Sequence, residues 1–352
     1  MKKYFIFRLK DNLKLIILFS VIALITTYAY TSGKYINEFN YSSIAANVRL
    51  PKDNPIEIIT TIALVLSIII PIFEFQYRMR KLTVDHLYSL PIKRERIFLT
   101  HYFVGFLEIM IPVTVSFFYS LLSFATKKHI FEVKYFIIYY FTLYLSVFII
   151  YSFIAFIFMR ANTVRDGIFN IIFGFFFFVC VFWLIEKGAQ TDSVIRKMDS
   201  TRAMCINPIS TLCDYFQTEM EWAARESAKS LGYYKDNPVA NFALGDVLWL
   251  IFNFVIAIAS FILSIILVKK DKSEDSMGIS TSWFSYKTMI PFYMYFFSCI
   301  SVYTSAIIYF FIAIGGYILY VIYRRNVKIK LYDLGILFGS IILGVITGLL
   351  IY

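Results

Sequence analysis

The chain of 352 residues is 59% hydrophobic and 20% aromatic, and only 16% of its residues are charged. Soluble domains carry about a quarter charged residues, so this composition excludes an ordinary soluble enzyme and predicts a polytopic membrane protein. The net charge of +11 does not indicate nucleic-acid binding. The lysines and arginines cluster at the ends of apolar runs, where they set orientation in a membrane.

The segment 1–14 is expected to form an amphipathic helix in the membrane interface before the chain enters the bilayer. Phe5, Leu9 and Leu13 recur every four residues, with basic residues on the rest of the segment. A frayed start to the first span is the alternative. Five basic residues against the single Asp11 predict a cytoplasmic N-terminus. No small-residue cleavage site of a signal peptide follows.

A helix that spans the bilayer needs about 20 mostly apolar residues. Runs of this kind occupy roughly residues 13–31, 56–75, 98–125, 135–159, 167–186, 246–268, 289–323 and 331–352. As one helix, 289–323 would be about 52 Å long, too long for a straight span. We favour a hairpin that turns near Ser301–Ser305, which makes about nine spans. One long tilted helix, with eight spans, is the alternative.

Counting spans from a cytoplasmic N-terminus places 76–97, 160–166 and 269–288 inside and 187–245 outside. The outer segment has seven basic and seven acidic residues, a balance that suits an external loop. We expect it to form a small, partly helical cap, because Thr218–Glu221 has the form of a capping box. Whether Cys205 and Cys213 pair depends on whether this segment faces an oxidising space.

Motifs of catalysis are missing from the sequence. There is no GxxxxGK[ST] phosphate loop, no HExxH and no CxxC. The three histidines, His86, His101 and His129, lie in separate loops or span ends, unlike the ligands of a metal site. We expect no catalytic residue, no metal and no ATP site in this chain.

Ionisable side chains inside apolar runs are the usual pointers to function in a membrane. Glu108 lies within the third predicted span. It belongs either to a transport pathway or gate, or to a structural hydrogen bond or ion pair, for which His101 is the expected partner. The structural role is favoured. Glu74, near the end of the second span, is expected at the membrane interface.

Two further patterns lie inside predicted spans. Tyr140, Tyr144 and Tyr151 fall on one face of the fourth helix, where they line a path for a polar lipid or peptide, or serve as packing anchors. The last run contains two GxxxG pairs, made by Gly335, Gly339, Gly344 and Gly348. Small residues at this spacing let helix backbones approach closely. Packing against the chain's own helices is favoured over a dimer seam.

The loop after the second span is strongly basic. Residues 76–100 carry six basic side chains against two acidic ones. The residue before a proline is pushed away from helical geometry, so a helix through Arg78–Leu90 should stop before Pro91. A new helix should then begin near Lys93. This predicts a short cytoplasmic helix with a basic rim; a solvated loop that obeys the positive-inside rule is the alternative.

The stretch from Phe73 to Leu122, with its core LYSLPIKRERIFLTHYFVG and with Pro112 further on, resembles part of the ABC-2 type transporter permeases. These are the membrane subunits of ATP-binding cassette exporters, and the similar stretch joins their second and third spans. Lys269–Glu274 is similar to a basic stretch of the Gram-positive subgroup with extra C-terminal spans. The layout of residues 1–275 also fits the family. A plain permease ends after six spans, so 289–352 departs from that pattern.

The resemblance implies an all-α protein with an interfacial elbow helix (1–14), a six-span ABC-2-like core (15–268), and a linker with two or three extra C-terminal spans (269–352). The loop 76–97 would hold a coupling helix that docks into a separate ATPase subunit. The contact residues would be Val84, Asp85, His86, Leu87, Tyr88, Ser89, Leu90 and Pro91, flanked by Lys93, Arg94 and Arg96. Leu87 and Leu90 would form its apolar face. Arg160, Arg165 and Asp166 would make a second contact.

By the same resemblance, ATP and Mg²⁺ would be bound by the partner ATPase. The permease would pair with a copy of itself or with a sister permease in a bacterial cell membrane, among membrane lipids. The exported substrate would be a peptide, a lipid or a drug-like molecule. Competing hypotheses are an ATP-independent transporter or channel, an intramembrane enzyme acting on lipid, and a sensor whose outer segment binds a ligand.

Overall fold

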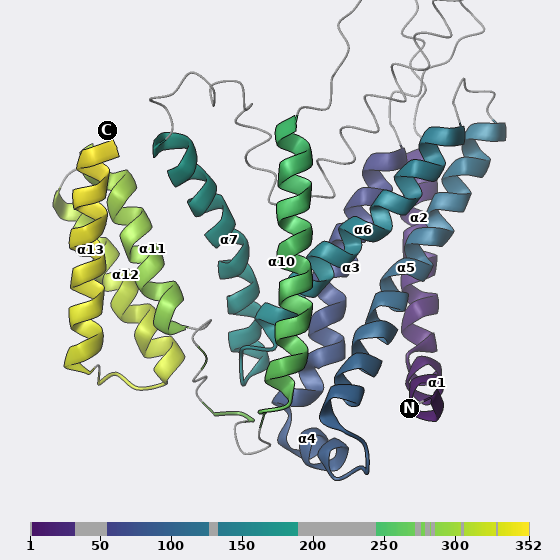
Figure 1. Cartoon of the computed structure of the whole chain (residues 1–352), viewed down its shortest axis with the longest axis horizontal. Helices are drawn as coiled ribbons and strands as arrows, with labels where there is room; N and C mark the ends of the chain where they lie inside the picture. Colours follow the sequence, from purple (N-terminus) through teal and green to yellow (C-terminus); the bar gives the residue numbers. More distant parts are fainter. Residues whose placement is uncertain are drawn as a thin grey trace, which may run out of the picture. The chain divides into compact units, whose positions relative to one another are not determined.

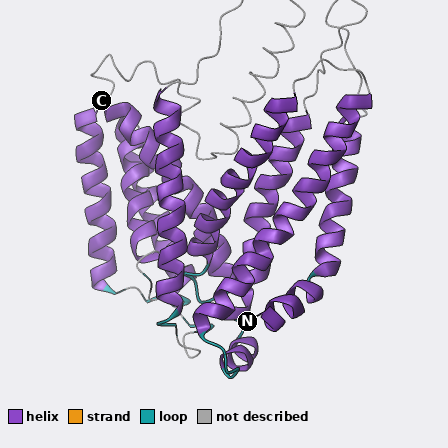
Figure 2. Ribbon diagram, turned by 45° about the vertical axis from the view of Figure 1, so that its right-hand side comes forward, coloured by secondary structure: helices purple, strands orange, loops and turns teal. Residues whose placement is uncertain are grey.

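The structure, a computed structural model, describes residues 2–31, 55–126, 133–188, 244–271, 276–278, 282, 286–303, 306–328 and 330–351. All regular secondary structure in these ranges is helical (Figure 2). Seven of the described helices are long and apolar enough to cross a membrane. The chain is therefore an all-α, multi-pass membrane protein, as its composition predicts. The predicted capping box at Thr218–Glu221, Cys205 and Cys213 lie outside the described residues.

The helices follow the predicted apolar runs (Figure 1). They are α1 (Lys2–Asp11), α2 (Leu13–Thr31), α3 (Pro55–Phe75), η2 (Gln76–Met79), α4 (Lys81–Tyr88), α5 (Arg94–Thr126), α6 (Val133–Phe158), α7 (Val164–Gly188), α10 (Leu244–Val268), α11 (Tyr286–Ile300), η5 (Ser301–Tyr303), α12 (Ala306–Arg324) and α13 (Leu331–Ile351). The seven helices of membrane-crossing length do not include α11. With 15 residues, α11 is about 22 Å long, shorter than a hydrocarbon core of about 30 Å.

The chain divides into two compact units. Unit 1 comprises Met1–Glu74, Ile92–Ile154 and Asn207–Lys269, and so contains α1, α2, α3, α5, most of α6 and α10. Unit 2 comprises Phe75–Pro91, Ala155–Ile206 and Lys270–Tyr352, and so contains η2, α4, α7 and α11–α13. The short helix α4 and α7 thus belong to the same unit as the C-terminal helices.

Aromatic packing around Tyr102 joins three helices of unit 1. The ring of Tyr102, in α5, lies 4.7 Å from that of Phe261 in α10 and 4.9 Å from that of Tyr151 in α6, measured between centroids. Its hydroxyl lies 2.6 Å from the Ser152 hydroxyl, so the buried O–H has a partner. Lipid tails are as apolar as the side chains, so close packing and hydrogen bonds hold such helices together rather than the hydrophobic effect.

The three C-terminal helices of unit 2 lie side by side and alternate in direction (Figure 1). The first, α11, ends at Ile300, η5 follows, and α12 begins at Ala306. The hydroxyl of Tyr309 donates to the Ser301 carbonyl at 3.1 Å across this turn. The break near Ser301–Ser305 predicted from the length of the run is confirmed, and a single long helix is excluded.

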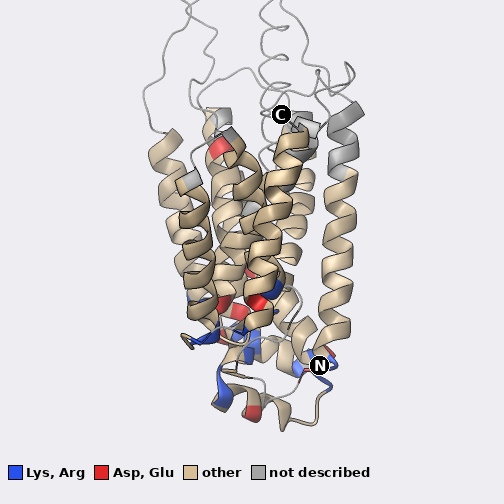
Figure 3. Cartoon of the chain, turned by 90° about the vertical axis from the view of Figure 1, so that its left-hand side faces the viewer, with Lys and Arg blue, Asp and Glu red and all other residues tan. Residues whose placement is uncertain are grey.

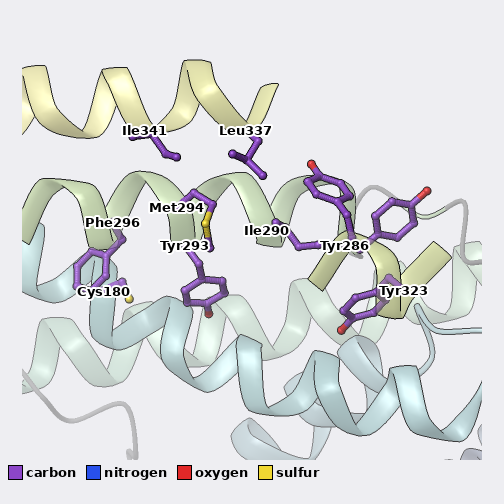
Figure 4. Close-up of a cluster of buried hydrophobic side chains, with 10 residues drawn as sticks. Cys180, Tyr286, Ile290, Tyr293, Met294, Phe296, Tyr323, Leu337 and Ile341 are labelled. Atoms are coloured by element: carbon purple, nitrogen blue, oxygen red, sulfur yellow. The ribbon is translucent and has the colours of Figure 1, made fainter. Parts of the chain in front are cut away.

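A buried cluster holds these helices to one another and to α7 (Figure 4). It contains Cys180, Tyr286, Ile290, Tyr293, Met294, Phe296, Tyr320, Tyr323, Leu337 and Ile341. The hydroxyl of Tyr293 donates to the backbone carbonyl of Phe173 in α7. At the end of α12, Arg324 forms an ion pair with Asp333 in the first turn of α13. The basic end of one helix and the acidic start of the next are thereby joined.

The GxxxG pairs of α13 divide into a packed pair and an open pair. A Cβ added at Gly344 would overlap the backbone carbonyl of Tyr295, and one at Gly348 would lie 2.6 Å from the Cys299 carbonyl oxygen. Both of these neighbours belong to α11, so this pair packs within the chain. Gly335 and Gly339 have no described atom within 4 Å of an added Cβ. For them the expected close packing against the chain's own helices is wrong.

Candidate functional site

The predicted coupling segment forms two short helices rather than one. The first, η2, ends at Met79, and Arg80 is extended with φ −106° and ψ 111°. The second, α4, then runs from Lys81 to Tyr88. A continuous helix from Arg78 to Leu90 was therefore the wrong prediction, but its end before Pro91 is confirmed.

One face of α4 points outward and the other is buried. Val84 and Leu87 are buried, whereas Leu82 is 88% exposed, and Asp85 and His86 are exposed as well. The expectation that Leu87 lies on the contact face is wrong. Leu82 and Leu87 are five residues apart and therefore lie on different faces of the helix, so Leu82 is exposed while Leu87 is buried.

The remaining residues of the predicted contact set are either exposed or half-buried. Ser89, Pro91, Lys93, Arg94 and Arg96 are exposed, and Tyr88 and Leu90 are half-buried. The helix α4 has eight residues and is too short to span a membrane, and its Leu82 is an exposed apolar side chain. Leu82, Asp85, His86 and Ser89 recur at helical spacing, and we call them the outward face of α4.

Three loop segments of unit 2 pack together next to η2. Nε and Nη2 of Arg78 bind the two carboxylate oxygens of Asp271 at 2.8 and 2.9 Å. The backbone N–H of Met277 donates to the Asn162 carbonyl at 3.0 Å. A Cβ at Gly167 would lie 3.3 Å from Cε of Met79. The residues around η2, the loop before α7 and the linker before α11 therefore form one assembly, which we call the loop cluster.

Arg160 lies inside the loop cluster. Its side chain is buried, and its guanidinium carbon lies 5.4 Å from the ring centroid of Phe156. Burial lowers the pKa of Arg160 to about 10; the charge of Arg78 adds to this effect and the charge of Asp271 opposes it. Arg160 therefore remains charged at neutral pH.

Of the three residues predicted to make a second contact with an ATPase, only one has an exposed side chain. Arg160 and Asp166 are buried, so neither offers its charge to a docked protein. Only Arg165 is exposed, with 56% of its side chain accessible. The expectation that Arg160 and Asp166 make surface contacts is wrong, because their charges are used inside unit 2.

A second polar site is buried in unit 1, where α1, α3 and α5 meet. Oε2 of Glu74 lies 2.7 Å from Nδ1 of His101. Oε1 of Glu74 accepts from Nη2 of Arg8 at 3.2 Å and from the side-chain amide of Asn12. The same amide donates to Glu108. We call these five residues, together with Tyr4, the buried network.

Tyr4 lies at the outer end of the network. Its hydroxyl is 3.1 Å from Nε2 of His101. If Nδ1–H of His101 donates to Glu74, Nε2 accepts the Tyr4 O–H, and one tautomer satisfies both bonds. Burial raises the pKa of Tyr4, Arg8 opposes this and Glu74 reinforces it. Tyr4 therefore remains an O–H donor at neutral pH.

Glu108 lies at the inner end of the network and is wholly buried. Its Oε2 has no hydrogen-bond partner among the described residues. A buried carboxyl oxygen without a partner is costly in a membrane, and such a group marks a place where water, an ion, a ligand or a moving side chain can bind. The network can therefore both hold α1 against α3 and α5 and respond to a change at Glu108.

The pairing inside the network differs from the expected one. Glu108 makes the predicted structural hydrogen bond, but with Asn12 instead of His101. His101 binds Glu74. Glu74 is buried; its place at the depth of the membrane interface stays a prediction. The separation of Asn12 and Glu74 by 62 residues explains why spacing along one helix could not reveal this contact.

The three predicted pathway tyrosines fall into two places. The hydroxyls of Tyr140 and Tyr144 are 2.5 Å apart, and each lies within 3.2 Å of Oγ1 of Thr114. Tyr151 is fully buried and donates to the Tyr102 carbonyl at 3.1 Å. A Cβ at Gly105 would overlap its hydroxyl, so this glycine allows the approach of Tyr151 to α5.

Sequence reasoning did not identify Arg8 or Asn12 as site residues. The available signal was an amide at the junction of the interfacial segment and the first span, a position where nothing in the apolar pattern requires one. Comparison of the chain with protein-family models finds no match, and comparisons with curated proteins and with solved structures find none either.

Proposed function

We propose that this chain is the permease subunit of an ATP-binding cassette exporter, with its N-terminus in the cytoplasm. The supporting observation is the outward face of α4, because Leu82 is exposed on a short helix between two helices of membrane-crossing length, α3 and α5. The exposed basic side chains at Lys81, Lys93 and Arg94 form a rim suited to an acidic docking surface.

Docking at α4 would act on the whole loop cluster. The ion pair between Arg78 and Asp271, with its one hydrogen bond from Nη2 to Oδ1, ties the segment before α4 to the linker that leads into α11. Hydrogen bonds between charged groups are stronger than those between neutral ones. A force applied at α4 by an ATPase subunit would therefore be shared with the C-terminal helices of unit 2.

The covalent path from α4 leads directly to the buried network. Upstream, α3 carries Glu74 one residue before its end at Phe75. Downstream, α5 begins at Arg94 and carries His101 and Glu108. The two helices that flank α4 along the chain thus hold the groups that bind α1, because Glu74 accepts from Arg8 and His101 contacts Tyr4. A shift of α4 on ATP binding would strain these bonds and rearrange α1 in the membrane interface.

The ATP and Mg²⁺ would be bound by the partner ATPase. A second permease, identical or related, would complete the exporter, and the substrate would leave between the two halves. The substrate class proposed is a peptide, a lipid or a drug-like molecule. The Tyr140–Tyr144–Thr114 hydroxyl cluster offers polar partners inside an apolar wall for such a molecule.

One observation favours a second candidate function. Glu74, His101 and Glu108 are buried together, and Oε2 of Glu108 lacks a hydrogen-bond partner among the described residues. Clusters of this type form proton relays in membrane pumps and transporters. A proton-coupled transporter that works without an ATPase would use these residues directly.

The test compares two equally exposed leucines of unit 2, Leu82 at 88% and Leu331 at 87%. Each is changed to Asp in the tagged full-length chain, which is purified from its native host in mild detergent. We expect an ATP-binding cassette subunit to accompany the unchanged chain and Leu331→Asp. Its retention by Leu82→Asp should fall roughly 30-fold, as for a hot-spot loss of about 2 kcal/mol.

Two outcomes would contradict the proposal. If Leu82→Asp retains and stimulates the ATPase normally, α4 is not the docking helix. If the unchanged chain is stable, comes alone, and moves protons in liposomes without ATP, the second candidate function replaces the first.

A further inference from the structure

Unit 2 contains an open hollow that the proposed function does not use. It has a volume of about 600 Å³ and is bounded by the first turn of α7 and by the end of α12 with the residues that follow it. Arg165 and Arg325 stand on its rim, and Val321, Ile322 and Val327 form its apolar wall. Volumes of this order accommodate small-molecule and cofactor ligands.

The two arginines are held in place but keep donors for a ligand. Nε of Arg165 is 3.8 Å and Nη2 of Arg325 is 3.9 Å from the carboxylate of Asp166. These separations are longer than hydrogen bonds, so Asp166 orients the two guanidinium groups without occupying those N–H donors. Nη1 of Arg325 donates to the Met277 carbonyl at 3.3 Å, which leaves its other N–H groups for a ligand. Side-chain exposure is 56% for Arg165, 45% for Arg325 and only 4% for Asp166. Two accessible positive charges thus face outward over one buried negative charge.

The apolar wall continues onto a surface that lipid tails would cover. Ile318 and Ile322 of α12 are 49% and 37% exposed, and α12 is one of the helices long and apolar enough to cross a membrane. Arg325 follows the last residue of α12, Arg324, and Arg165 lies in the first turn of α7. Basic residues at the ends of apolar helices are the ones that meet lipid headgroups when such helices cross a membrane. In unit 2 the lysine and arginine segments lie at the helix ends opposite the C-terminus (Figure 3). The hollow therefore offers a site for an anionic group beside an apolar groove, the arrangement that a phospholipid with a charged headgroup and acyl chains requires.

We propose that this hollow binds one anionic phospholipid, whose phosphate contacts Arg165 and Arg325 and whose acyl chains run along Ile318 and Ile322. Guanidinium groups suit phosphate oxygens because they donate two parallel hydrogen bonds. A soluble protein loop would match the charges but not the apolar wall at membrane depth, so the lipid is the better fit. The proposal assigns Arg165 to lipid rather than to an ATPase, and it holds whether or not the chain is an exporter subunit.

The experiment uses the full-length chain in detergent, with native mass spectrometry to count retained lipids. Phosphatidylglycerol is the anionic probe and phosphatidylcholine the zwitterionic one. We expect Arg165→Gln/Arg325→Gln to bind the first retained phosphatidylglycerol roughly 30-fold more weakly, the loss expected for two basic groups at a lipid surface. Binding of phosphatidylcholine should change little.

The matched control is Lys328→Gln/Lys330→Gln, which removes two exposed charges that do not line the hollow. An equal loss of phosphatidylglycerol in both double variants would show a general surface field and overturn the site. Displacement of the lipid by excess inorganic phosphate would identify a phosphate site instead, which also overturns the proposal. So would unchanged lipid binding in the arginine variant together with loss of a co-purifying ATPase. Each single arginine variant gives the same comparison if the double variant unfolds.

Discussion

The outward face of α4 and the buried network use similar side chains in opposite ways. On α4, Asp85 and His86 are exposed, where water solvates their charges and salt screens them. In the network, Glu74 and His101 are buried, and each depends on its partner for solvation. A change on α4 should therefore alter binding and leave the fold intact. A change in the network should alter the fold itself.

The largest expected effect comes from Glu74→Leu. This substitution removes the shared acceptor of Arg8, Asn12 and His101. Breaking a buried pair by removing one partner costs about 3–5 kcal/mol. We expect the free energy of unfolding, measured in mild detergent with denaturant, to fall by this amount. A loss below about 1 kcal/mol, the level of a surface pair, would show that water has access to the network.

Arg8 supplies the matched control, because it binds two carboxylates. Its Nη1 lies 2.9 Å from Asp11, whose side chain is 56% exposed, while its Nη2 binds the buried Glu74. Asp11→Asn should lower the free energy of unfolding by less than about 1 kcal/mol, as for exposed ion pairs. Equal effects of Asp11→Asn and Glu74→Leu would contradict the distinction between exposed and buried charge.

A smaller contrast of the same kind lies within α13. Gly344→Ala would place a methyl group against the Tyr295 carbonyl, a backbone atom that cannot rotate away. Overpacking of this type costs about 1–3 kcal/mol. Gly335→Ala meets no described atom within 4 Å and should stabilise the helix by a few tenths to about 1 kcal/mol. Thermal unfolding of the two variants measures the difference, and a destabilising Gly335→Ala would instead reveal a partner helix at that face.

The predictions from sequence succeeded for features that a single stretch of the chain determines. The run 289–323 is too long for one straight span, and the basic residues that follow it favour a return to the cytoplasmic side, so these two features together indicated the break that appears between Ile300 and Ala306. Pro91 likewise predicted the end of α4. Leu87 was misplaced because an apolar face on a short helix packs either against a partner or against the chain itself, and the sequence does not say which; Val84 and Leu87 are buried within the chain.

Contacts between segments that are distant along the chain could not be predicted from the sequence. Glycine spacing was the same for both pairs in α13, but only the neighbours Tyr295 and Cys299 show which pair is packed. Asn12 reaches Glu108 across 96 residues, and no periodic pattern records such a pairing. The isolated carboxyl in a span did predict a buried polar contact, because its desolvation requires one, but not its identity.

The smallest expected effect is a difference in interaction energy between two ion pairs. Their members Lys269 and Asp271 lie two residues apart, directly after α10. Asp271 forms an ion pair with Arg78 that includes one hydrogen bond, and the two side chains are 11% and 13% exposed. Lys269 lies 3.5 Å from Glu95, with side-chain exposures of 52% and 34%. Double-mutant cycles with Arg78→Gln/Asp271→Asn and Lys269→Gln/Glu95→Gln isolate each pair's interaction energy.

The first cycle should show a coupling of about 1.5 kcal/mol or more, as for hydrogen bonds to charged groups, and the second only about 0.2–1 kcal/mol. Raising the salt concentration should reduce the second coupling more than the first, because screening acts on exposed pairs. If both couplings are small and equally sensitive to salt, the loop cluster is not a rigid assembly. A movement of α4 would then not be transmitted to the C-terminal helices through Arg78 and Asp271.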